Sequence, residues 1–195
     1  MKAPLGAFVE ALAFALAAHD VPLTGTPKQA VFRIHRDTRF SHDKRPYKTN
    51  AGAVLTRDGD KRSPGLLYLQ LDGECGFVAA GFYQPEPPTL AALRAGIAER
   101  GDDWRATVAA LEAAGRPLSE EGAAKRLPRP FEAAVVGELE RWLRLKSFTV
   151  SRRLSPAEMG APDLVGTVTA FADAALPLLR FGWRAIDTYR GRKAA

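Results

Sequence analysis

The densest group of polar side chains in the chain lies between Arg33 and Asn50, where cations, carboxylates and hydroxyls follow one another closely. Between Lys28 and Arg62 there are ten Lys or Arg and four Asp, an excess of +6 that equals the net charge of the whole chain. The rest of the chain therefore sums to zero. A positive charge confined to one stretch favours a local anion site over general basicity.

Four cations of this stretch are of the types that hold a phosphate or a carboxylate: Arg36, Arg39, Lys44 and Lys48. Ser41 and Tyr47 add hydroxyl groups suited to an oxyanion. Asp37 and Asp43 are weak catalytic candidates, because each would either orient the arginines or act as a general base. A structural interpretation stays open beside this one. It is a salt-bridged loop in which Asp43 caps locally and Tyr47 packs on a sheet.

A second patch of candidate residues follows: Phe77, Phe82, Tyr83, Glu86 and Arg94. Tyr83 and Glu86 are predicted at the rim of the same ligand pocket, where a strand turns into a helix. The alternative is that Pro85 and Pro87 only shape this connection.

The sequence offers little support for other chemistry, and no cofactor or metal is predicted. His19, His35 and His42 lack the i, i+4 spacing of zinc ligands, and Cys75 has no second cysteine. Ser41 lies outside a Gly-x-Ser-x-Gly motif, and neither a Walker loop nor a Gly-x-Gly-x-x-Gly motif is present. Whether the protein is an enzyme stays open.

The same polar stretch carries a family resemblance. Residues 36–49 read Arg-Asp-x-Arg-Phe-Ser-x-Asp-Lys-x-Pro-Tyr-Lys-Thr, and three later pieces agree: Ala80–Pro87, Leu90 with Arg94, and Leu145–Phe148. Together they resemble the DUF2461 family, also called TIGR02453, over nearly the whole chain. The resemblance implies no established activity, cofactor or catalytic residue.

Two departures from the family pattern are apparent. Members usually begin with a further segment that contains an Asn-rich, Trp-Phe stretch and a Tyr, and this segment is expected to be missing ahead of the helix at Leu5. The family's Pro-Arg-Gly-Phe turn with a following His-Pro piece is here Pro128–Ala133. A family site that used this His would be incomplete in this chain.

The hydrophobic pattern predicts an α+β fold in one domain covering 1–195, with an antiparallel meander of about four to six strands packed against several helices. Strands are expected at Ala30–His35, Ala51–Thr56, Leu66–Leu71, Phe77–Tyr83 and Ser147–Arg152. Helices are expected at Leu5–Asp20, from Pro88, after a cap at Asp102 and Asp103, and at Phe131–Leu145 and Pro162–Tyr189. Pro177 should kink the last helix, and Gly191–Ala195 should form a loose tail.

Bulk composition fits a soluble globular protein, with 46% hydrophobic and 26% charged residues. One cysteine and the lack of an uninterrupted apolar run of about 18 residues favour the cytoplasm and no membrane partner. The wide apolar stripe of the first helix, with Phe14 and Leu16, predicts a homodimer through the N-terminal and C-terminal helices.

The leading functional expectation is a protein that binds a small phosphorylated or carboxylated ligand at the stretch Arg36–Lys48, and enzymatic turnover of that ligand is left open. The first alternative is a nucleic-acid-binding protein that uses the same basic surface, extended by Arg152 and Arg153, with Phe40, Tyr47 and Tyr83 stacking bases. The second alternative is a protein-interaction adaptor.

Overall fold

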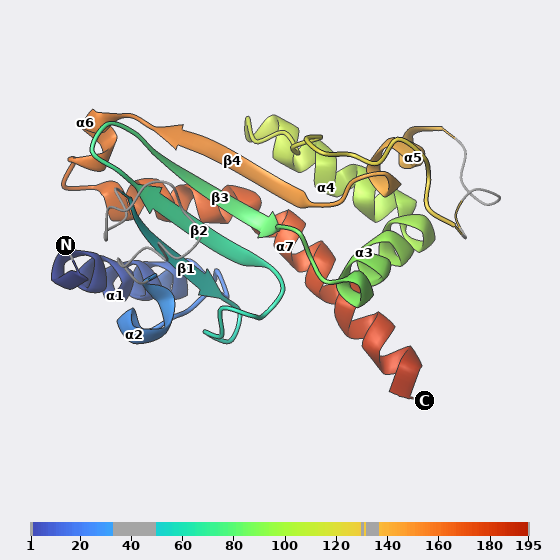
Figure 1. Cartoon of the computed structure of the whole chain (residues 1–195), viewed down its shortest axis with the longest axis horizontal. Coiled ribbons are helices and arrows are strands. Elements are labelled where there is room, and N and C mark those ends of the chain that lie inside the picture. The colour runs from blue at the N-terminus through green and yellow to red at the C-terminus, as the bar shows by residue number, and fades with distance from the viewer. Residues whose placement is uncertain (1, 33–49, 130, 132–136, 195) are drawn as a thin grey trace, which may run out of the picture. The chain divides into compact units, whose positions relative to one another are not determined.

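The computed structural model describes residues 2–32, 50–129, 131 and 137–194. The fold is α+β, as predicted, with one four-stranded antiparallel sheet in the order β1-β2-β3-β4 (Figure 1). The elements in chain order are α1 (Lys2–Ala18), α2 (Pro27–Ala30), β1 (Ala51–Thr56), β2 (Leu66–Leu71), β3 (Gly76–Phe82), α3 (Pro87–Glu99), α4 (Gly101–Ala113), α5 (Glu138–Leu143), β4 (Phe148–Leu154), α6 (Pro156–Met159) and α7 (Leu164–Ala194).

The chain divides into two compact units. The first unit comprises Met1–Ala79 with Ser151–Asp173, and the second comprises Ala80–Val150 with Ala174–Ala195. β3, β4 and α7 contribute residues to both units.

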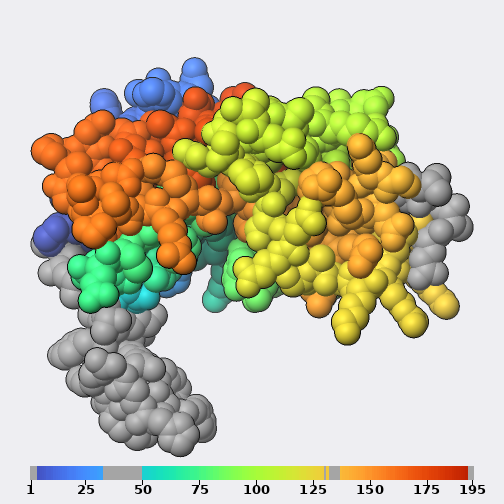
Figure 2. Space-filling view, turned by 90° about the horizontal axis from the view of Figure 1, so that it is seen from above, coloured from blue at the N-terminus to red at the C-terminus, as the bar shows by residue number. Residues whose placement is uncertain are grey.

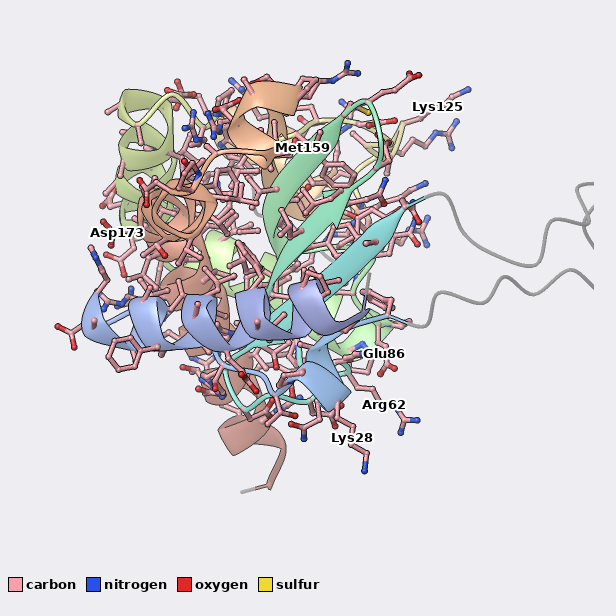
Figure 3. The ribbon with its side chains drawn as sticks, turned by 90° about the vertical axis from the view of Figure 1, so that its left-hand side faces the viewer. Lys28, Arg62, Glu86, Lys125, Met159 and Asp173 are labelled. Atoms are coloured by element: carbon pink, nitrogen blue, oxygen red, sulfur yellow. The ribbon has the colours of Figure 1, made fainter. Side chains whose placement is uncertain are left out.

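The first unit is built on the β1–β2 hairpin. Its register runs from Ala51 opposite Leu71 to Thr56 opposite Leu66. The alternating leucines of β2 bury Leu67 and Leu69 on one face, because successive side chains of a strand point to opposite sides. α1 covers the hairpin with residues at helical spacing, and Leu5 and Val9 share a buried cluster with Ala53 (Figure 3).

The predicted strand Ala30–His35 is wrong at its start. Pro27–Ala30 is a short helix, with Pro27 in its first turn and the Thr26 side chain accepting the Gln29 N–H. Among its described residues the predicted strand keeps a bridge, where Val31 lies opposite Ala53 and the Phe32 N–H donates to the Gly52 carbonyl. Residues 33–35 of the predicted strand lie outside the described residues.

The second unit packs around Trp104, which is 1% exposed. Its ring lies 6.0 Å from that of Trp142, 5.8 Å from that of Phe148 and 4.9 Å from that of Phe181.

The predicted cap of α4 is wrong in detail: Asp102 and Asp103 lie in the first turn of the helix, and Arg100 occupies the cap position. Carboxylates in the first turn still favour the helix through its dipole.

Two helical predictions change in extent. Within the predicted helix Phe131–Leu145, the described residues form one α-helix, α5 (Glu138–Leu143). Residues 132–136 are not described. The predicted loose tail is wrong for residues 191–194, which continue α7, and the helix runs through Pro177.

By length and composition Leu164–Arg192 could cross a membrane, but 56% of its most apolar part is buried inside the protein, as in a core helix.

Ser155 and Glu158 form a capping box, as their spacing of three residues favours. The Ser155 N–H donates to Glu158 Oε2 at 2.9 Å, and Arg152 Nη1 donates to Glu158 Oε1 at 2.8 Å. The hydrogen bonds from Ser155, first the backbone and then the hydroxyl, lower the pKa of Glu158, and Arg152 adds to this shift.

We expect Glu158→Gln to remove a stabilising contribution that is pH-dependent. A depressed folded-state pKa stabilises the protein above the ordinary glutamate pKa of about 4.3, and this contribution is lost as the pH falls through the folded-state pKa. Urea unfolding of both proteins between pH 7 and pH 3 measures it. The wild type should be the more stable at pH 7, and the difference should shrink toward pH 3. A difference independent of pH would contradict the prediction.

Candidate functional site

A hollow of about 600 Å³ in the second unit is the candidate site. Its volume falls in the range typical of small-molecule sites, about 300–1,000 Å³. Three stretches of chain line it together with Leu90 of α3: the turn after β3, the segment after α4 and the start of β4. The lining residues are Tyr83, Gln84, Pro85, Leu90, Ser119, Glu121, Gly122, Lys146, Ser147 and Thr149.

The first wall is the turn between β3 and α3. Gly81 has a φ of +129°, and a Cβ there would overlap the carbonyl oxygen of Phe148, so only glycine lets β3 approach β4 this closely. Gln84 has a φ of +40°, which is rare for a residue with a side chain. Its N–H donates to Ser147 Oγ at 2.9 Å. This turn leaves the Tyr83 ring 65% exposed at the hollow.

The second wall is the start of β4, and Arg94 on α3 is hydrogen-bonded to the backbone just before it. Its Nη2 donates to the Leu145 carbonyl at 2.9 Å, and burial lowers the pKa of the Arg94 guanidinium. Arg94 Nε is buried without a hydrogen-bond partner among the described residues. Burial of part of a guanidinium is costly, and the hydrogen bond to the Leu145 carbonyl offsets part of this cost. Arg94 thus positions Lys146 and Ser147.

The third wall is the segment after α4. The Ser119 N–H donates to the Thr149 carbonyl at 2.9 Å, which covers the outer edge of β4. Farther along, Arg144 Nε donates to the Ala124 carbonyl at 2.8 Å, and Arg141 pairs with Glu120 at 2.7 Å. Figure 2 shows the yellow segment that follows α4 lying beside the orange segment that leads into β4.

These walls present one cation, one carboxylate and several hydroxyls to the hollow. Lys146 and Glu121 are exposed, and neither forms an ion pair with another described residue. A lysine ammonium binds phosphate or carboxylate as a point charge, and an exposed tyrosine ring stacks on a planar group. Ser147 Oγ accepts a backbone N–H, and no described histidine or carboxylate is hydrogen-bonded to it as a nucleophile would require. The arrangement is suited to binding.

The residues predicted from the sequence fall into two groups. Tyr83 lines the hollow, whereas Glu86 is exposed at the N-cap of α3 and does not line it. The remaining candidates lie outside the described residues: Arg36, Asp37, Arg39, Ser41, Asp43, Lys44, Tyr47 and Lys48. Pro87 begins α3, so it does shape the connection, while Pro85 also contacts the hollow.

Sequence reasoning did not select Lys146, Ser147 or Ser119 as site residues. The piece Leu145–Phe148 carried part of the family resemblance, and that was a signal for the first two. Ser119 had no such signal, because only its hydrogen bond to Thr149, thirty residues later in the chain, brings it to the hollow.

Cys75 is poorly suited to act as a nucleophile. It is exposed, and the hydrogen bond from its Sγ to Asp72 Oδ2, at 3.2 Å, is the largest of the influences that raise the pKa of its thiol. Among the described residues, no three or more His, Cys, Asp or Glu side chains gather as they would around a metal ion.

Comparison with known proteins matches residues 1–181 to the sequence model of one family, DUF2461, which is described as a conserved hypothetical protein. No curated protein and no solved structure matches the chain significantly.

Proposed function

The chain belongs to the DUF2461 family, and we propose that it binds a small phosphorylated or carboxylated ligand in the hollow between Tyr83 and Lys146. The observation that carries the proposal is the convergence of two separate pieces of the family pattern, Ala80–Pro87 and Leu145–Phe148, on one concave site. Packing alone does not require an exposed tyrosine and an unpaired lysine at the same hollow.

Each wall then has a part in binding. Lys146 attracts the anionic group, and the hydroxyls of Ser119 and Thr149 donate to its oxygens. The Tyr83 ring stacks on the planar or apolar part of the ligand. Glu121 accepts hydrogen bonds from hydroxyl or amino groups, which favours a ligand that carries such groups besides its anion.

Anion binding by the basic stretch Arg36–Lys48 remains a separate prediction, because these residues lie outside the described part of the chain. Arg39→Ala and Lys44→Ala in the binding assay test its contribution.

The homodimer also remains a prediction: Leu16 is buried, but Phe14 on α1 is 79% exposed.

We expect Lys146→Met to weaken binding of a phosphorylated or carboxylated ligand about tenfold. A hydrogen bond to a charged group contributes about 1.5–3 kcal/mol, and solvent exposure of Lys146 puts it near the lower end. The ligand is first selected by thermal-shift screening against phosphorylated metabolites, carboxylated metabolites and short oligonucleotides. Its affinity for wild type and variant is then measured by titration calorimetry.

Lys125→Met is the matched control, because Lys125 is an exposed lysine of the same unit that does not line the hollow (Figure 3). It should weaken binding less than Lys146→Met does, because its charge does not line the hollow and is exposed to solvent and salt. Equal losses for both lysine variants would contradict the site. Stabilisation by oligonucleotides alone would contradict the small-ligand proposal.

A further inference from the structure

Three aromatic rings form a row across the sheet of the first unit. Phe32, beside β1, lies 6.0 Å from Tyr68 on β2 at an interplanar angle of 70°. Tyr68 in turn lies 5.5 Å from Phe77 on β3 at 52°. We call Phe32, Tyr68 and Phe77 the ring row. Its members come from the segment beside β1, from β2 and from β3.

The ring row occupies the sheet face opposite the core. Leu69, opposite Ala53 in the register, is buried on the side where α1 packs, and Ala53 contacts that helix's cluster with Leu5. Tyr68 alternates with Leu69 and so points to the other side, where it is only half-buried. Phe32 is 37% exposed. The described part of the chain therefore leaves edges and faces of these rings accessible.

The backbone makes room for the rings at Gly52. A Cβ there would come within 3.2 Å of the Tyr68 hydroxyl and 3.4 Å of Phe32 Cδ2, so a side chain would push the two rings apart. The Tyr68 hydroxyl donates to Gln70 Oε1 at 2.9 Å, which fixes the ring in the row. The surface is thus aromatic with a polar margin.

Positive charge flanks the row. Lys61 Nζ lies 4.7 Å from the centroid of Phe32 and donates to the Val31 carbonyl at 2.9 Å, so its ammonium is held beside the first ring. On β4, Phe148, Val150 and Leu154 are buried, so the alternating Arg153 points to the outer face. Arg153 is exposed and forms no ion pair with any residue that the structure describes.

We propose that the ring row binds single-stranded nucleic acid. Aromatic side chains on an open sheet face stack successive bases, and flanking lysine and arginine side chains attract the phosphates. Base stacking and phosphate attraction do not read base edges, so binding is expected to tolerate different sequences and to weaken as salt rises. The site is separate from the hollow at Lys146 and does not depend on it.

Fluorescence anisotropy with a labelled ten-nucleotide uridine oligomer at two salt concentrations tests the proposal. Tyr68→Leu and Phe77→Leu should each raise the Kd about tenfold, in the range found for loss of one base–aromatic stack. Tyr68→Phe keeps the ring but removes its hydrogen bond to Gln70, so its loss of affinity should be smaller than that of Tyr68→Leu. Phe14→Leu removes an exposed aromatic ring from α1 and should also leave the Kd unchanged.

An abasic oligomer of the same length separates stacking from charge attraction. Wild type and Tyr68→Leu should bind it equally weakly, because its phosphates remain and its bases are gone. Circular dichroism and thermal unfolding establish that each variant is folded. Three results would overturn the proposal: no binding of the uridine oligomer by wild type, equal binding by folded Tyr68→Leu and wild type, or a loss as large for Tyr68→Phe.

Discussion

We expect Gly81→Ala to lower the free energy of unfolding by about 2–5 kcal/mol. The residue has a φ of +129°, which costs a residue with a Cβ about 1–2 kcal/mol. The added methyl group would also overlap the carbonyl oxygen of Phe148, and overpacking against backbone costs about 1–3 kcal/mol. Urea unfolding followed by circular dichroism measures the loss.

Gly115→Ala is the matched control for this prediction. Gly115 has a φ of +67°, but a Cβ there would meet no atom within 4 Å. Only the conformational cost of about 1–2 kcal/mol should remain. Similar losses at both glycines would show that β3 does not approach β4 at Phe148 as described. Because this approach shapes the turn at Tyr83, Gly81→Ala should also weaken ligand binding.

We expect Trp104→Ala to lower the free energy of unfolding by about 3–5 kcal/mol, the usual range for removal of a buried tryptophan. The side chain is 1% exposed and contacts three other rings, including that of Phe148 at the start of β4. The variant should therefore also loosen the wall that carries Ser147. Chemical denaturation measures the first effect, and the affinity for the selected ligand measures the second.

Trp104→Phe distinguishes the packing of the ring from the role of its N–H. Trp104 Nε1 is buried without a hydrogen-bond partner among the described residues, so its removal relieves a desolvation penalty. Phenylalanine should lose only about 1–2 kcal/mol, because the smaller ring leaves part of the space unfilled. A loss as large as that of Trp104→Ala would indicate that the indole N–H has an important partner.

The parts of the fold that local pattern determines were predictable. Leu66–Leu71 was predicted with its correct bounds because its apolar residues alternate, and the capping box at Ser155 depends on residues three apart. Near Ala30 two local signals competed. The alternation of Phe32 and Ile34 suggested a strand, but Thr26 and Pro27 begin a helical turn that continues through Ala30.

The candidate site was predictable only in part. Tyr83 and the piece containing Lys146 stand out in the sequence, but their proximity depends on the Gln84–Ser147 hydrogen bond, between residues 63 positions apart. The ring row was not predicted from the sequence either, because Phe32, Tyr68 and Phe77 come into contact only when the strands pair. The basic stretch Arg36–Lys48, the strongest signal in the sequence, remains a prediction outside the described residues.

The most direct test of the proposed ligand site is a ¹H–¹⁵N NMR titration of the assigned protein with phenyl phosphate. This probe combines a ring for Tyr83 with an anion for Lys146, while inorganic phosphate and phenol carry one feature each. We predict saturable shifts of the amides of Gln84, Glu121, Ser147 and their lining neighbours, larger with phenyl phosphate than with either fragment. Shifts confined to residues outside the hollow, or unchanged in Lys146→Met, would contradict the account.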